Sequence, residues 1–247
     1  MVGSTVEPSR FVRPGIKARE RILLDVPRFR QPDDVTCGPT CLAQVYRFLG
    51  HDRTVEQVIE DTPRNADGGT LGVYLGISAL RNGFRPTIYT YNLRIFDPTW
   101  RPLSNPGLRA KLRQRQRFVQ SARLQRAIGA YIDYLKMGGR VRFSDLEPAL
   151  LIRLLDRGHP ILTGLSATYL YDTARERDDE YDDVRGEPAG HFVVVCGYYP
   201  CSDRFVIRDP SSHIPFSRTG KYTVEAHRLI SAILLGDVTY DANLLVL

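Results

Sequence analysis

Residues 37–50 read Cys-Gly-Pro-Thr-Cys-Leu-Ala-Gln-Val-Tyr-Arg-Phe-Leu-Gly and are the best-marked helical stretch of the 247-residue chain. Its apolar side chains recur at the i, i+3, i+4, i+7 spacing of an amphipathic helix, namely at Leu42, Val45, Tyr46 and Leu49. Gly50 follows the last of them and provides the stop. The stretch therefore predicts a helix that opens near Cys37 and ends near Leu49.

Cys37 lies at the start of this predicted helix, where backbone N–H groups have no intrahelical acceptor. These groups and the helix dipole stabilise a negative charge, and the thiolate is the reactive form of cysteine. Pro39 suits a first helical turn because its missing N–H costs nothing there, and Gly38 lets a substrate approach the sulfur. The competing interpretation is that Cys37 is a small buried apolar side chain.

A second motif lies far downstream. His191 opens a β-forming run that ends at Tyr199, residues 200–203 predict a turn, and residues 204–209 predict the antiparallel return strand. In such a hairpin His191 and Asp209 lie at the same open end, so the carboxylate can accept the Nδ1–H of the imidazole. A thiol nucleophile, a histidine base and an orienting carboxylate are what acyl transfer from an amide or ester requires.

Together these motifs resemble the papain-like cysteine peptidases. The matching residues are Gln31, Cys37-Gly-Pro-Thr-Cys41-Leu, Gly190-His191-Phe-Val-Val-Val and Asp209-Pro210. Within that superfamily they are most similar to the bacteriocin-processing double-glycine leader peptidases and their stand-alone relatives (peptidase family C thirty-nine-like). Those leader peptidases form the N-terminal part of membrane exporters, and this sequence has no counterpart of the membrane part, so we do not expect the double-glycine substrate.

The resemblance implies an α+β, papain-like fold. A helical N-terminal part, with the nucleophile at a helix N-terminus, would pack on an antiparallel β-sheet. The resemblance also assigns the roles of nucleophile, general base and acid, orienting acid and oxyanion donor, in that order, to Cys37, His191, Asp209 and Gln31. The backbone N–H of Cys37 would be the second oxyanion donor.

We therefore expect a cysteine-dependent hydrolase of peptide or amide bonds that acts through a thioester acyl-enzyme. An acyltransferase or amide-forming enzyme is the first alternative, because it would use the same Cys-His-Asp machinery and resolve the thioester with an amine. A non-catalytic module that holds a peptide or a partner in the same cleft is the alternative from another class. The presence of all four site residues favours an enzyme.

The remaining elements follow ordinary signals within one expected domain, residues 1–247. Helices are predicted at residues 54–60, 71–82 and 224–235, and strands at residues 87–91, 160–170 and 243–247. Residues 97–142 predict a basic helical insertion, with one helical stretch from Leu108 to Met137. Between residues 101 and 142 there are eleven Lys and Arg and one acid. Such a run could follow phosphates but is more often a solvated face, and it has few aromatics, so we expect no nucleic-acid partner.

Residues 172–189 form an acidic loop directly before His191. Five of its acids are expected to rim the cleft and to attract a cationic peptide or small amide substrate: Asp178, Asp179, Glu180, Asp182 and Asp183. The alternative is that this loop docks on the basic helix or lies in solvent.

Four cysteines form two close pairs, Cys37 with Cys41 and Cys196 with Cys201. Their C-x3-C and C-x4-C spacings differ from the C-x2-C of common zinc sites, so we expect thiols, no metal and no cofactor. Cys41 and Cys196 are expected to be buried and Cys201 exposed. Residues 1–30 lack the apolar core of a secretory signal, and no apolar run approaches the roughly 20 residues of a membrane span, so we expect a cytoplasmic protein without a membrane partner.

Overall fold

The structure is a computed structural model, and it describes residues 20–65, 68–178, 180–236 and 242–247. In this part of the chain eight strands form the main sheet: β1 (Ile22–Leu23), β2 (Thr87–Thr90), β3 (Arg140–Arg142), β4 (Ile161–Ser166), β7 (Gly190–Tyr199), β8 (Arg204–Arg208), β9 (Lys221–Glu225) and β10 (Asn243–Val246). They lie in the order β3-β2-β10-β4-β7-β8-β9, and β1 also pairs with β7. β2 and β3 run parallel, whereas the other paired strands of this sheet are antiparallel.

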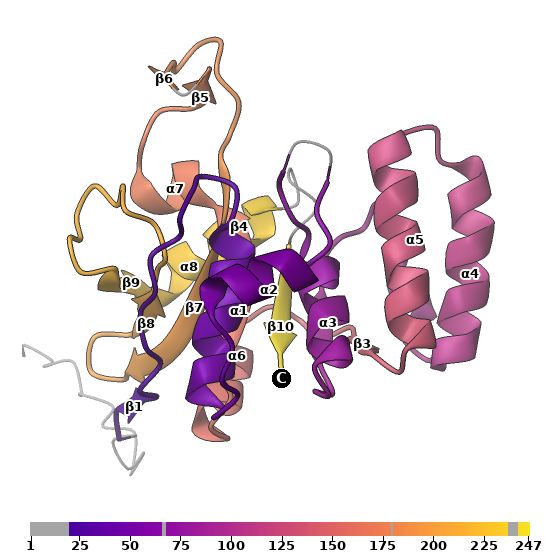
Figure 1. The fold of residues 1–247 in the computed structure, drawn as a ribbon, viewed down its shortest axis with the longest axis horizontal. Coiled ribbons are helices and arrows are strands. Elements are labelled where there is room, and N and C mark those ends of the chain that lie inside the picture. The colour runs from indigo at the N-terminus through magenta and orange to yellow at the C-terminus, as the bar shows by residue number, and fades with distance from the viewer. Residues whose placement is uncertain (1–19, 66–67, 179, 237–241) are drawn as a thin grey trace, which may run out of the picture.

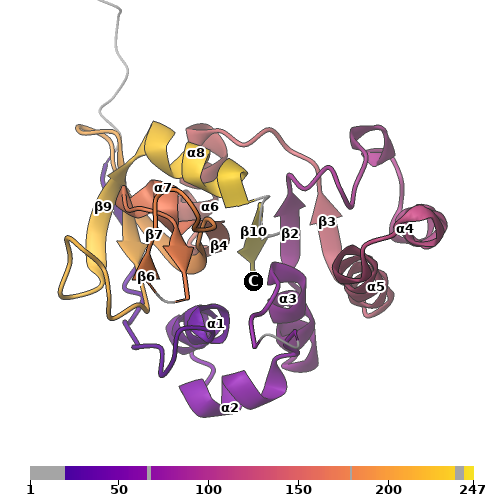
Figure 2. The same cartoon turned by 90° about the horizontal axis from the view of Figure 1, so that it is seen from above.

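Helices cover both faces of the sheet. On one side lie α1 (Cys37–Phe48), α2 (Val55–Asp61) and α3 (Gly72–Arg81), and on the other lie α6 (Pro148–Asp156), α7 (Ala167–Tyr171) and α8 (Ala226–Leu235) (Figure 2). Beyond the β3 edge stands a helical hairpin of α4 (Asn105–Phe118) and α5 (Ala122–Lys136), preceded by the short 3-10 helix η1 (Pro98–Trp100) (Figure 1). The predicted α+β class is confirmed. Within the described ranges, no helix is both long and apolar enough to cross a bilayer.

Strand β7 has buried side chains on both faces of the sheet, and for this reason helices cover both faces. Side chains alternate along a strand, and those of β7 are buried on each side. Phe192, Val194 and Cys196 belong to the core that α1 and α3 cover, whereas Val193 and Val195 belong to the core that α6 and α8 cover. A strand buried on both faces has a continuous apolar sequence, and this is the origin of the Phe-Val-Val-Val-Cys run.

The basic stretch does not form the single helix predicted from Leu108 to Met137. It folds back on itself as α4 and α5, with the backbone extended at Val119. Ser121 begins the second helix, because its hydroxyl accepts a hydrogen bond from the Leu124 N–H at 3.3 Å. Eight buried apolar side chains of α5 join the same core as α1 and α3: Leu124, Ala127, Ile128, Ala130, Tyr131, Ile132, Tyr134 and Leu135.

Two segments that flank the candidate site also differ from prediction. The predicted strand 160–170 ends at Ser166, whose hydroxyl caps the next helix, α7. The predicted helix 224–235 begins only at Ala226, because Lys221–Glu225 pairs with β8 as the edge strand β9. These two differences determine where α7 and β9 end relative to the site described below.

Tyr134 connects the helical hairpin to the sheet. Its side chain is fully buried, and its hydroxyl lies 2.8 Å from the Pro86 oxygen and 3.1 Å from the Arg140 oxygen. We expect Tyr134→Ala to lower the free energy of unfolding by about 3–5 kcal/mol, because it leaves a cavity and removes the donor to both carbonyls. Urea unfolding measures this loss.

The matched control for this prediction is Phe118→Ala. Phe118 is another aromatic residue of the hairpin, but its side chain is 81% exposed. Its removal should change the free energy of unfolding by no more than about 0.5 kcal/mol. If Tyr134→Ala lowers the free energy of unfolding as little as Phe118→Ala does, α5 does not unfold together with the sheet.

Candidate active site

Cys37 is the first residue of α1. Thr36 precedes it as the N-cap, and its carbonyl accepts the Thr40 N–H at 3.1 Å, the first bond of the helix. The N–H groups of the first turn before Thr40 have no intrahelical acceptor. A Cβ at Gly38 would come within 2.5 Å of Thr70 Cγ2, so glycine is required for this close approach between the helix start and the neighbouring segment.

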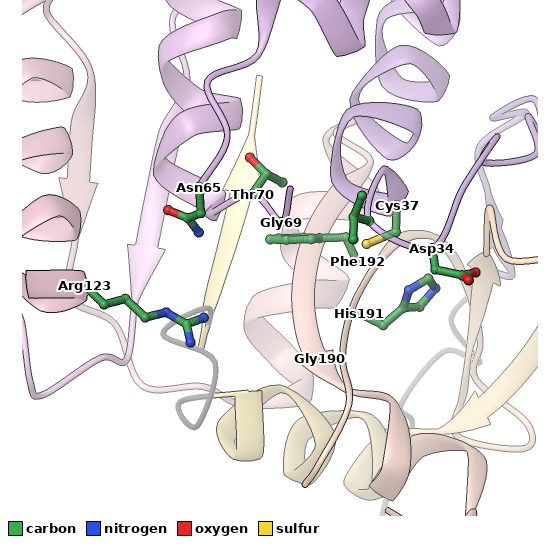
Figure 3. A pocket seen from close by; sticks show the side chains of 10 residues that line it. Asp34, Cys37, Asn65, Gly69, Thr70, Arg123, Gly190, His191 and Phe192 are labelled. Atoms are coloured by element: carbon green, nitrogen blue, oxygen red, sulfur yellow. The ribbon is translucent and has the colours of Figure 1, made fainter. Parts of the chain in front are cut away.

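His191 is the second residue of β7, and Asp209 directly follows β8. The hairpin brings them to one end, where His191 Nε2 lies 2.9 Å from Asp209 Oδ1. The sequence predicted that Nδ1 would face the carboxylate, and the orientation of the ring corrects that detail. The other ring nitrogen, Nδ1, is not bound to Asp209, and the Cys37 side chain lies beside the ring (Figure 3).

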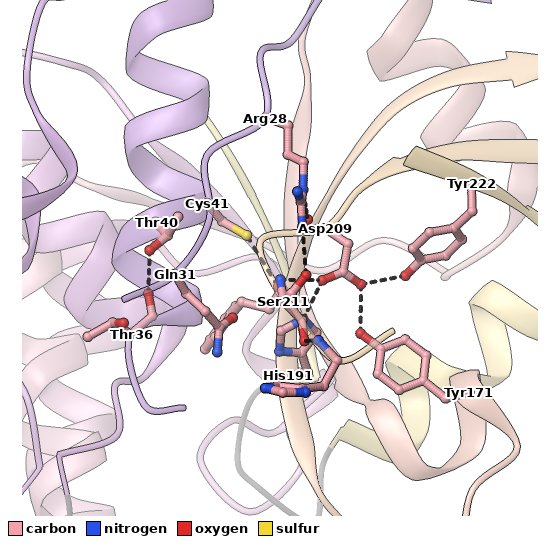
Figure 4. A network of polar contacts seen from close by, with 12 residues as sticks. Arg28, Gln31, Thr36, Thr40, Cys41, Tyr171, His191, Asp209, Ser211 and Tyr222 are labelled. Atoms are coloured by element: carbon pink, nitrogen blue, oxygen red, sulfur yellow. Dashed lines mark hydrogen bonds and ion pairs between the residues drawn. The ribbon is translucent and has the colours of Figure 1, made fainter. Parts of the chain in front are cut away.

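Asp209 is fully buried and accepts four hydrogen bonds (Figure 4). Its Oδ1 accepts from His191 Nε2 and from the Ser211 N–H, each at 2.9 Å. Its Oδ2 accepts from the hydroxyls of Tyr171 and Tyr222, at 2.6 and 2.7 Å. Burial raises the pKa of Asp209, but the positive charge of His191 and these donors outweigh burial and hold the pKa below its ordinary value. Asp209 is therefore a carboxylate at neutral pH.

The same contacts determine the charge of His191. Burial lowers the pKa of His191, because it disfavours the imidazolium. The Asp209 carboxylate and the Cys37 side chain act in the opposite direction and raise the pKa of His191 to about 10. The imidazolium is thus favoured at neutral pH, and it is the partner that a reactive thiolate needs.

Gln31 belongs to a segment that is fixed to the loop after β8. Its backbone N–H donates to the Pro210 oxygen at 3.0 Å, and the nearby Arg28 guanidinium donates to the Asp209 backbone oxygen at 3.2 Å. Its side-chain Nε2 donates to the Asp33 oxygen at 2.9 Å, whereas its Oε1 has no partner among the described residues. An amide nitrogen carries two N–H groups, so Asp33 uses only one of them. Gln31 is not among the described residues that line the pocket beside Cys37 and His191, and its role as oxyanion donor stays a prediction.

Cys41 lies one turn after Cys37 and is fully buried. Burial raises its pKa well above the ordinary value, so it remains a thiol, and this thiol donates to the Phe192 oxygen at 3.2 Å. Because Phe192 follows His191, this bond links the helix of the candidate nucleophile to the strand of the histidine. All four cysteines are free thiols, and of these only Cys201 is exposed. In the described ranges no three Cys, His, Asp or Glu side chains are grouped in a way that could hold a metal ion.

A pocket opens over Cys37 and His191 (Figure 3). Its walls come from the start of α1, the start of β7, the segment before α3 and the start of α5. Asp34, Asn65, Thr70 and Arg123 are among the described side chains that line it. No motif in the sequence marks these four residues, because they reach the pocket from separate segments.

The acidic loop, residues 172–189, extends away from the sheet and contains two short strands, β5 (Glu176–Arg177) and β6 (Glu180–Tyr181) (Figure 1). Four acids of the predicted rim are described, and they are not among the residues that line the pocket: Asp178, Glu180, Asp182 and Asp183. Asp182 accepts hydrogen bonds from its own loop, namely from the Val184 N–H and the Arg185 N–H. Asp179 lies outside the described residues. The role of these acids in attracting a cationic substrate stays a prediction.

The two tyrosines that donate to Asp209 were not predicted. Tyr171 lies at the end of α7, in a region predicted to be a strand followed by a loop, and Tyr222 lies in β9, just before a predicted helix. The one available signal was the alternation of Lys221–Glu225, which is typical of a strand and would have brought Tyr222 onto the buried face.

The similarity to known proteins lies in the structure rather than in the sequence. No family model matches the sequence, and no curated protein matches it. Among solved structures the chain is similar to a "putative C39-like peptidase from Bacillus anthracis", with 15% sequence identity and a TM-score of 0.40. The similarity covers 92% of this chain and 97% of that chain.

Proposed function

We propose that this protein is a cysteine-dependent hydrolase of peptide or amide bonds that forms a thioester on Cys37. The observation that supports this most strongly is the path from Cys37 to His191, which lines the same pocket, and from His191 Nε2 to the buried Asp209 carboxylate, 2.9 Å away. The path begins at the start of a helix and faces a pocket, where a substrate carbonyl can reach the sulfur.

In this mechanism His191 accepts the Cys37 proton at Nδ1, and the thiolate attacks the carbonyl carbon. The Cys37 N–H and the second N–H of Gln31 Nε2 stabilise the negative oxygen that forms. As the C–N bond breaks, the proton on Nδ1 passes to the leaving amine. Water then attacks the thioester and gives its proton to His191, which returns it to the sulfur as the acid leaves.

Asp209 keeps its charge throughout this cycle. Its bond to Nε2 fixes the ring so that Nδ1 faces the sulfur, and its carboxylate stabilises the imidazolium. Four donors compensate the buried charge, which is why the carboxylate does not need to be protonated itself.

Thiol reactivity tests this proposal without a known substrate. We expect iodoacetamide to label Cys37 faster than Cys201 under mildly acidic conditions, between about pH 5 and 7, because the neighbouring imidazolium cation favours the reactive form of the sulfur. Cys201 is the internal control, since it is an exposed thiol without such a partner. In His191→Ala the advantage of Cys37 should disappear. Peptide mass spectrometry quantifies the labelling of each cysteine.

If Cys37 in the wild type reacts no faster than Cys201, the proposed catalytic role is wrong, and a binding function of the same pocket becomes the better explanation. Hydrolysis and transfer to an amine share every step up to the thioester. Analysis of the products with and without an added amine identifies the acceptor.

A further inference from the structure

Arg123 reaches the pocket from the opposite side to the sulfur (Figure 3). It is the second residue of α5, two residues after the Ser121 cap, and it precedes the buried residue Leu124. The backbone at this position is therefore fixed by the cap and by the core. A guanidinium held by a packed helix, rather than by a long loop, can determine specificity.

The charges of the pocket are unevenly distributed. Asp34 lies on the side of Cys37, and apart from His191 the cation among the described lining residues is Arg123. A guanidinium has five N–H donors in a planar arrangement that matches a carboxylate, so a contact within the protein still leaves donors for a ligand. The side chain is exposed, which reduces the expected strength of such a pair but keeps the guanidinium accessible.

We propose that Arg123 binds a carboxylate of the substrate while Cys37 attacks the carbonyl of the bond to be cleaved. This inference rests on the proposed hydrolase function and narrows its substrates to peptides with an anionic group on the α5 side of the pocket. In a peptide that group is the side chain of an aspartate or glutamate, or the free C-terminus. Arg123 would then be a specificity-determining residue contributed by the basic hairpin.

Reactive peptides test the inference directly. Iodoacetyl-capped oligoglycines of increasing length, ending either in a carboxylate or in a carboxamide, would alkylate Cys37 as the sulfur displaces iodide. Because both members of a pair meet the same sulfur, the ratio of their labelling rates is independent of how strongly that sulfur is activated. At the length that spans the pocket, we expect the carboxylate to react roughly fivefold faster than the carboxamide. A third series with a glutamate side chain and an amidated end distinguishes the two sources of the carboxylate.

The variants make the assignment specific. In Arg123→Gln the ratio of labelling rates should fall to about one. High salt should lower the ratio of the wild type in the same way, because salt screens the charge of the guanidinium. Arg126→Gln is the matched control, because Arg126 lies on the same helix but lines a different pocket, beside Tyr74 and Asp133. It should keep the preference of the wild type.

The two proposals fail in distinguishable ways. A ratio near one at every length, or one that Arg123→Gln leaves unchanged, overturns the role of Arg123 even when Cys37 labels rapidly. Slow labelling of Cys37 by neutral iodoacetamide overturns the hydrolase instead, and in that case the ratio measured over longer times still reports whether Arg123 attracts the carboxylate.

Discussion

Cys37→Ala and His191→Ala are each expected to lower kcat/KM by roughly 10⁵-fold for the peptide that the wild type cleaves fastest in a mixed peptide library. Cys37→Ala removes the atom that forms the thioester. His191→Ala removes both the group that accepts the thiol proton and the group that protonates the leaving amine. Cleavage followed by mass spectrometry gives the rates, and thermal melting confirms that each variant is folded.

The double variant makes this prediction sharper. Residues that act as one unit are not additive, so Cys37→Ala with His191→Ala should be no slower than the worse single variant by more than about tenfold. Cys201→Ala is the thiol control and should keep the full rate, because its exposed side chain lies in the turn between β7 and β8. Losses that add up, or a Cys37→Ala variant that retains cleavage, would mean that Cys37 and His191 do not act together.

The parts of this site that could be predicted from sequence depend on local patterns. The helix that opens on Cys37 is marked by its own apolar period, and the β7–β8 hairpin by two β-forming runs around a turn. Each pattern lies within about twenty residues, so neither needs knowledge of the rest of the fold. Because the two patterns place Cys37 at a helix start and His191 with Asp209 at a hairpin end, the candidate residues followed from them.

The parts that could not be predicted depend on contacts between distant segments. Tyr171 and Tyr222 lie 38 and 13 residues from Asp209 in the sequence. They belong to α7 and β9, and they reach Asp209 only because these two elements meet the sheet beside it. The break between α4 and α5 contains no glycine or proline, and its one local signal is the Ser121 cap. Arg123 enters the pocket only because that break turns α5 back along α3 and toward Cys37.

The orientation of the His191 ring also could not be predicted from the sequence. Hairpin geometry brings the ring near Asp209 but does not decide which nitrogen faces it. That choice follows from the position of α1 on the sheet, which the bond from the Cys41 thiol to the Phe192 oxygen helps to fix. Tertiary packing, rather than the hairpin, therefore decides which ring nitrogen faces Cys37.

Asp209→Asn is expected to lower the free energy of unfolding at neutral pH by about 3–5 kcal/mol, because it removes one partner of a buried ion pair. Each carboxylate oxygen accepts two hydrogen bonds, and all four partners are donors. An amide has one acceptor oxygen, so its NH₂ group would face either the two tyrosine hydroxyls or the His191 and Ser211 donors.

Asp203→Asn is the matched control. Asp203 accepts a bond from Tyr198 at 2.8 Å, but it is exposed at the other end of the hairpin, and its replacement should cost no more than about 0.5 kcal/mol.

The pH dependence of stability separates the loss of this charge from a general loss of packing. His191 has its pKa raised from 6.5 to about 10 in the folded protein, so its contribution is complete below about pH 6.5 and is lost as the pH rises toward 10. Asp209 has its pKa lowered from 3.8, so its contribution is present above that pH and is lost as the pH falls through the lower value of the folded state.

In Asp209→Asn both pH limbs should be weakened, because the variant has no carboxylate to titrate and only Cys37 is left to oppose the lowering of the His191 pKa by burial. Urea unfolding of the wild type and the variant across this pH range measures both limbs. The alkaline limb of kcat/KM should move to lower pH in the variant for the same reason, since the thiolate–imidazolium pair ends where His191 loses its proton. If the variant is less stable than the wild type by the same amount at every pH, Asp209 contributes packing alone, and its carboxylate does not raise the pKa of His191.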